Sequence, residues 1–163
     1  MAEEIVMSDT TEDYPTHDAS LVGAAGVHTV VAELSLRGLI ALPTIRNTAG
    51  VDVIVANKAG TSHANLRVKT SRSRVTFWPI GARYADWIGP NNFYVFLRFY
   101  KKIGRFEIFL ESSLNVAKNC ADGIKKEKEN GLKPWAPSFY PRDGFEKLKA
   151  QWDNFGRETA NER

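Results

Sequence analysis

The segment Asn92–Tyr100 constrains the fold of this chain more than any other part of the sequence. Successive side chains of a strand point to opposite faces of a sheet, and here both sets are largely apolar. One set is Phe93, Val95, Leu97 and Phe99, and the other is Tyr94, Phe96, Arg98 and Tyr100. A strand with this pattern is buried on both sides. We therefore expect it to be a central strand, covered on both faces.

The elements around this strand predict an α/β fold. Apolar residues at helical spacing and the stop signal at Gly38 favour a first helix from a Ser20 cap to Arg37. Short β-rich runs and one further helix, capped by Ser112 or Ser113, are expected at 39–44, 51–57, 65–71, 92–100, 105–111 and 113–129. A last helix is expected over 143–155. The order α-β-β-β-β-β-α-α implies one mixed sheet of about five strands flanked by helices.

Length and composition favour one domain. The 163 residues, 43% of them hydrophobic, are enough for one proper core, which we assign to 20–163. Residues 1–19 are polar and acidic, and we expect a flexible tail. No apolar run approaches the roughly eighteen residues of a membrane helix, so we expect no membrane partner. The single cysteine, Cys120, suits a reducing cytoplasm.

The net charge of +3 conceals an asymmetry. Six of the 19 carboxylates and none of the 22 Lys and Arg residues lie in 1–20. Between Leu21 and Ile80 the chain has two acids, Glu33 and Asp52, against seven cations. A basic surface with few acids is the pattern expected for a polyanion partner such as DNA or RNA, although a solvated basic face has the same composition.

Asp52 and Lys69 lie near the two ends of a predicted β-hairpin over 50–70. An aspartate can hold a divalent metal ion and a lysine can orient a phosphate. These two groups are the minimum set for metal-assisted phosphodiester chemistry. Without further information, each is equally well an ordinary residue at a strand end.

The order helix–strand–strand–strand, with Asp52 opening the second strand and Lys69 ending the third, resembles the PD-(D/E)XK nuclease superfamily. The matching segments are 26–38, 50–54 and 68–71. Within the superfamily the chain is similar to the branch near archaeal Holliday-junction resolvases and small bacterial nuclease-fold proteins. The resemblance implies a restriction-endonuclease-like sheet, a metal ligand at Asp52 and a catalytic lysine at Lys69. It also allows a homodimer.

Three positions depart from the family pattern. Arg67 stands where the family has an acid or glutamine before the lysine, Val27 where many members have a helix-borne glutamate, and Val51 where a proline is usual. Mg²⁺ often takes only one or two carboxylates, so Asp52 alone allows Mg²⁺ or Mn²⁺ to bind, with poor affinity. Loss of two acids puts cleavage in question but not the fold.

The same departure favours a phosphate-binding surface. The predicted nucleic-acid contacts are Arg67, Arg72, Arg74 and Lys58, and a guanidinium grips phosphate through two parallel hydrogen bonds. Three readings follow. The first is a divergent nuclease-fold protein with weak or absent metal-dependent cleavage. The second is a catalytically inactive nucleic-acid-binding protein. The third is a protein-interaction module that kept the fold.

The remaining candidates point to structural roles. Glu33 is spaced to pair with Arg37 at i,i+4, and Glu107 and Glu111 lie on a later strand, away from the hairpin. His28 is expected to be a surface or half-buried helix residue rather than a base. The tryptophans are more typical of core and lid positions than of base stacking.

Overall fold

The computed structural model describes residues 18–45, 50–72, 75–100, 104–134 and 136–141. Its elements, in chain order, are α1 (Ala19–Leu36), β1 (Ile40–Pro43), β2 (Val53–Ala56), β3 (His63–Ser71), β4 (Trp78–Pro79), the 3-10 helix η1 (Tyr84–Trp87), β5 (Asn92–Tyr100), β6 (Arg105–Ser112), α2 (Ser113–Glu129) and β7 (Ser138–Phe139). The predicted α/β class is confirmed. The expected helix over 143–155 and the tail before residue 18 lie outside the described residues.

Five strands form one mixed sheet in the order β1-β2-β3-β5-β6. β3 and β5 are parallel, and the other neighbouring pairs are antiparallel. β5 lies between β3 and β6, and its residues 94–99 are buried, as the two-sided apolar pattern predicts. A second sheet, the short pair β4–β7, was not expected from the sequence.

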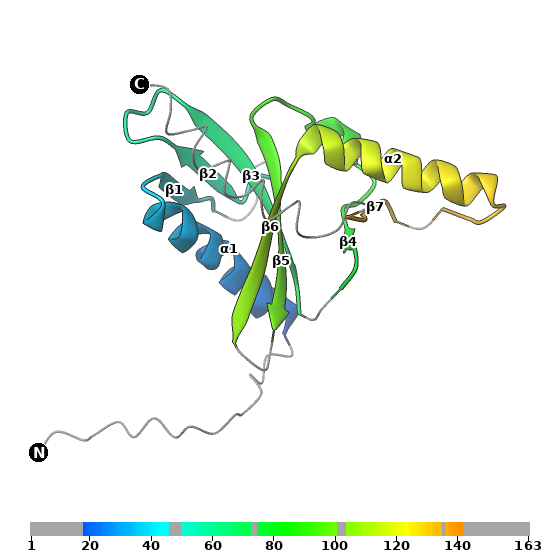
Figure 1. Ribbon diagram of the computed structural model, residues 1–163, viewed down its shortest axis with the longest axis horizontal. Helices are drawn as coiled ribbons and strands as arrows, with labels where there is room; N and C mark the ends of the chain where they lie inside the picture. The colour runs from blue at the N-terminus through cyan, green and yellow to red at the C-terminus, as the bar shows by residue number, and fades with distance from the viewer. Residues whose placement is uncertain (1–17, 46–49, 73–74, 101–103, 135, 142–163) are drawn as a thin grey trace, which may run out of the picture.

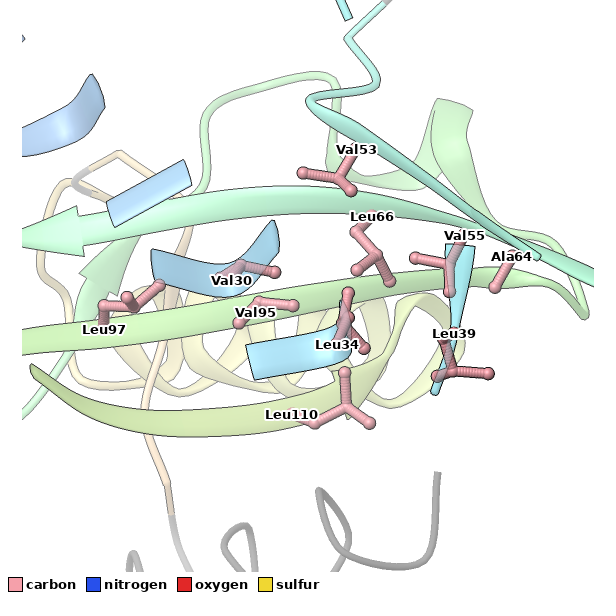
Figure 2. Packing of buried hydrophobic residues seen from close by; sticks show 10 residues of the cluster. All are labelled: Val30, Leu34, Leu39, Val53, Val55, Ala64, Leu66, Val95, Leu97 and Leu110. Atoms are coloured by element: carbon pink, nitrogen blue, oxygen red, sulfur yellow. The ribbon is translucent and has the colours of Figure 1, made fainter. Parts of the chain in front are cut away.

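Two hydrophobic clusters cover the two faces of the main sheet. α1 packs over one face, where its fully buried Val30 and Leu34 contact strand residues such as Leu66 and Val95 (Figure 2). α2, η1 and β7 cover the other face, where the cluster includes Trp78, Trp87, Tyr94, Phe96, Phe109, Val116, Cys120 and Phe139. Alternation along β5 separates the two sets, since Val95 belongs to the first and Tyr94 to the second. Figure 1 shows the two long helices on opposite sides of the sheet.

The ends of both helices follow capping rules. Ser112 caps α2 by accepting a hydrogen bond from the Asn115 amide, as expected. The predicted Ser20 cap of α1 is wrong, because Asp18 caps the helix and accepts from the Ser20 amide at 2.7 Å. Gly38 ends α1 with a positive φ of 84°, a conformation that glycine adopts at little cost.

The sequence predicted no apolar segment as long as a membrane helix, and α1 contradicts that prediction. By length and hydropathy alone this 18-residue helix would be able to cross a membrane. Its four buried residues, Val22, Gly26, Val30 and Leu34, lie on the side that packs on the sheet. A test based on length and hydropathy cannot distinguish the two cases.

Candidate active site

Asp52 directly precedes β2, at the end where the pairing of β2 with β3 stops. The paired register of the two strands reaches Val53 opposite Leu66, and the Asp52 amide still donates to the Leu66 carbonyl at 2.8 Å. The next amide of β3 that points toward β2 belongs to Val68, and it donates to Oδ2 of Asp52 at 2.7 Å. The carboxylate therefore continues the hydrogen bonding of the strand pair beyond Val53, the first residue of β2.

Val68 separates the two cations of this strand, Arg67 and Lys69. Burial lowers the pKa of the Lys69 ammonium, and the Arg67 charge lowers it further, whereas the Asp52 carboxylate acts to raise it. Asp52 is hydrogen-bonded to the residue before Lys69, and its charge acts on the Lys69 ammonium. Whether they are catalytic remains a prediction.

Arg67 is held by three groups of the protein. Its Nε donates to the Gly50 carbonyl at 2.6 Å and its Nη1 donates to the Tyr94 hydroxyl at 3.3 Å. Its guanidinium carbon lies 4.3 Å from the centre of the Trp87 ring, within cation–π range. This arrangement, which we call the Arg67 clamp, leaves fewer donors for a phosphate than the sequence implied.

The other predicted nucleic-acid contacts are spread along β3. Lys58 lies in the turn between β2 and β3, next to Gly38, and Arg72 follows the opposite end of β3. Nine strand residues separate these positions, about 30 Å at the usual rise. Arg74 lies outside the described residues. The basic residues therefore do not gather into one patch with Lys58.

The acids elsewhere have other partners. Glu33 pairs with Arg37 at 3.7 Å, as predicted. Glu107 pairs with the buried Arg98 and accepts from the Tyr100 hydroxyl at 2.8 Å. Glu111 is buried, and it accepts from the Ser112 amide and from the Asn115 side chain. Within the described part of the chain, no three His, Cys, Asp or Glu side chains gather in a way that could hold a metal ion.

A groove of about 810 Å³ borders Asp52 on the α1 side. Its lining residues are Ser20, Leu21, Gly23, Ala24, Val27 and His28 of α1, Pro43, Thr44 and Ile45 at the end of β1, and Gly50, Val51 and Asp52 before β2. Val27, at which the resemblance described above would place a glutamate, thus shares a groove with the predicted metal ligand. This juxtaposition could not be read from a single element of the sequence.

No protein-family model matches the chain, and no curated protein matches it. Among solved structures, the chain is similar to the bacterial homing endonuclease I-Ssp6803I, with a TM-score of 0.53. The two are 9% identical, over 89% of this chain and 97% of that one. At this identity the similarity shows a shared, nuclease-like fold.

Sequence reasoning missed the Arg67 clamp and the groove. Trp87 and Tyr94 are 20 and 27 positions from Arg67, so no local pattern connects them. In β5, Tyr94 alternates with apolar neighbours, and this pattern predicted that it is buried but not that it contacts Arg67. By contrast, the expectation that tryptophans serve the core is confirmed for Trp78 and Trp87, which are 2% and 9% exposed.

Proposed function

We propose that this chain is a divergent PD-(D/E)XK-fold protein that acts on nucleic acid, with at best weak cleavage dependent on Mg²⁺ or Mn²⁺. The observation that carries the proposal is the hydrogen bond from the Val68 amide, the residue before Lys69, to the Asp52 carboxylate. The fold shared with a homing endonuclease supports it.

The chemistry assigns a role to each side chain. Oδ2 of Asp52 is occupied by the Val68 amide, and Oδ1 has no hydrogen-bond partner among the described residues, so it is available to a cation. A divalent ion bound there would polarise the phosphate and activate a water molecule as the nucleophile. Lys69 positions that water and offsets the negative charge that develops on the phosphate.

Nicking of supercoiled plasmid in Mn²⁺ and in Mg²⁺ tests the proposal. Asp52→Asn keeps the shape and removes the charge, and Lys69→Met keeps the length and removes the ammonium. Each is expected to lower the nicking rate by about 10²–10³-fold, the usual effect of removing one preorganised electrostatic group. Asp86→Asn is the matched control, because Asp86 is exposed and its ion pair among the described residues is with the surface Arg83. Nicking that survives both site substitutions overturns the assignment.

A second candidate function is nucleic-acid binding without cleavage. It is favoured by the lack of a second acid beside Asp52 in the described residues and by the cations of β3 and its exit. Four phosphate contacts would give a logarithmic salt slope of about −3.6, and three, with Arg67 retained in its clamp, about −2.7. Gel shifts across salt concentrations measure this slope. No shift at low salt would favour the protein-interaction reading instead.

A further inference from the structure

Three consecutive residues of β3 hold the segment that leads into β2. The Leu66 carbonyl accepts from the Asp52 amide at 2.8 Å, and the Val68 amide donates to Oδ2 of Asp52 at 2.7 Å. Between them, Nε of Arg67 donates to the Gly50 carbonyl at 2.6 Å. Asp52 precedes the first paired residue of β2, so its position depends on contacts of this kind and not on the regular pairing of the strands.

The Arg67 contact differs from the other two because it is made by a long side chain. A long side chain can hold a partner only when its own rotamer is fixed, which costs conformational entropy. Trp87 and Tyr94 fix it here, through the cation–π contact at 4.3 Å and the hydrogen bond at 3.3 Å. Both aromatic residues are buried, with exposed fractions of 9% and 1%. The guanidinium therefore connects the Gly50 carbonyl to the hydrophobic cluster under α2 and η1.

The fit between Arg67 and Gly50 is close. A Cβ at position 50 would lie 2.3 Å from Nη2 of Arg67, nearer than real Cβ atoms approach another atom. Gly50 also has a positive φ of 75°, which glycine adopts at little cost. The absence of a side chain at this position lets the backbone lie directly against the guanidinium.

We propose that Arg67 is a positioning residue for Asp52. The Arg67 clamp holds Gly50 against β3, and this keeps the segment 50–52 where the Asp52 carboxylate meets the Val68 amide. The inference rests on the proposed function, in which Asp52 is the metal ligand. It gives Arg67 a different role from the predicted contact with nucleic acid. The arginine that stands in place of a family acid would then support the acid that remains.

The contacts of Arg67 favour this role over phosphate binding. Two of its nitrogens donate within the protein, and one face of the guanidinium lies on the Trp87 ring. A phosphate gripped by two parallel hydrogen bonds needs two adjacent N–H groups of the same guanidinium. Phosphate binding would therefore compete with the contacts that hold Gly50.

Arg98 on β5 provides a matched control. Its Nη1 donates to the Val75 carbonyl at 3.3 Å, and its guanidinium carbon lies 5.0 Å from the centre of the Phe109 ring. Like Arg67, it connects a backbone carbonyl to an aromatic ring of the same cluster. It lies in register with Ser71 at the end of β3, four residues beyond Arg67. Arg98→Lys keeps a cation for the pair with Glu107 and removes the planar fork.

Hydrogen exchange of backbone amides, followed by NMR on the protein in EDTA, tests the inference. The Val68 amide measures the hold on Asp52. The Leu97 amide lies in the middle of the central strand β5 and measures global unfolding. Arg67→Met should speed exchange at Val68 about fivefold to tenfold more than at Leu97, as expected for loss of a hydrogen bond. Arg67→Lys should act in the same direction, because an ammonium lacks the planar fork. Arg98→Lys should change both amides equally.

DNA binding and nicking give a second measurement, which a phosphate contact and a positioning role move differently. In gel shifts with duplex DNA in EDTA, Arg67→Met should keep the wild-type salt slope, whereas loss of a phosphate contact would lower it by about 0.9. Nicking in Mn²⁺ at saturating protein should fall by about tenfold to 100-fold, because a small misplacement of a reacting group is costly. The concentration of protein at half-maximal rate should not change.

Each failure has its own signature. The inference is overturned if exchange at Val68 rises no more than at Leu97 in Arg67→Met, or in Arg67→Lys should the first variant not fold. A salt slope lowered by about 0.9 in Arg67→Met also overturns it, as does selective release of Val68 in Arg98→Lys. A wild-type protein that neither nicks nor binds DNA overturns the proposed function, and exchange at Val68 still decides whether Arg67 holds Asp52 in place.

Discussion

The Val68 amide donates to the Asp52 carboxylate at 2.7 Å, and this one hydrogen bond sets the geometry of the site. It holds the acid against the strand that contains Lys69, at the residue where β2 stops pairing with β3. The Asp52 carboxylate thus accepts a hydrogen bond from a strand amide, as backbone carbonyls do elsewhere in the sheet.

Arg67→Ala should destabilise the protein by about 1–3 kcal/mol, because the Arg67 clamp contains two hydrogen bonds and one cation–π contact. Urea unfolding measures the change. Arg83→Ala is the control, since Arg83 is 89% exposed and its surface pair with Asp86 is worth less than about 1 kcal/mol. Equal midpoints for the two variants would show that the clamp adds no stability.

Gly50→Ala should destabilise more than Gly60→Ala. Both residues have positive φ, 75° and 69°, so both substitutions incur the left-handed strain of about 1–2 kcal/mol. A Cβ at Gly50 would in addition overlap the Arg67 guanidinium, whereas a Cβ at Gly60 meets open space. The excess measured by urea unfolding should disappear in the Arg67→Ala background. An excess that persists there would have another origin.

Gly26→Ala should destabilise the protein by about 1–3 kcal/mol, as overpacking usually does, because a Cβ there would overlap the buried hydroxyl of Thr70 on β3. Gly23→Ala, one turn earlier in α1, meets nothing and should stabilise the helix by about 0.5–1 kcal/mol. Thermal or urea unfolding separates opposite signs readily. Thr70→Ala should reduce the Gly26→Ala penalty, and a penalty unaffected by Thr70→Ala would argue against this contact.

Lys69→Met should raise the urea midpoint at neutral pH while lowering the rate of any cleavage. Burial is the first cause of the lowered pKa of Lys69, so the folded state binds its proton less well than the unfolded state does, whose value is near 10.5. Below the folded pKa the penalty for burying the charge is fully present. It is relieved as the pH rises through that pKa toward 10.5. The stability difference between the variant and the wild type should therefore narrow on going from pH 7 to pH 10. A constant difference would contradict the assignment.

Val27→Glu should increase Mn²⁺ affinity about tenfold or more, because a second carboxylate would share the groove with Asp52 and affinity rises with ligand charge. Titration calorimetry measures the affinity. Ala24→Glu, on the same wall one turn earlier, is the control, and Val27→Glu combined with Asp52→Asn should lose the gain. Equal gains in both glutamate variants would show that the ion responds to general charge.

Local patterns in the sequence predicted most of the fold. Asn92–Tyr100 was expected as a central strand with these bounds, and Ser112 was expected as one of two caps of α2, because strand alternation and capping depend on neighbours within a few residues. The pair β4–β7 was missed. Its register joins Trp78 to Phe139, across 61 positions, and two-residue strands have no period to detect.

For the site, the sequence by itself determined the chemistry that is available: one acid at Asp52, the cations Arg67 and Lys69 on alternate positions of one strand, and an apolar helix with a single imidazole. Only the tertiary structure decided how these groups are used. Arg67 turns inward to Trp87 and Tyr94, and His28 shares a groove with Asp52. The packing of α1 and η1 on the sheet, and the pairing of β5 with β3, bring together residues that no local rule connects.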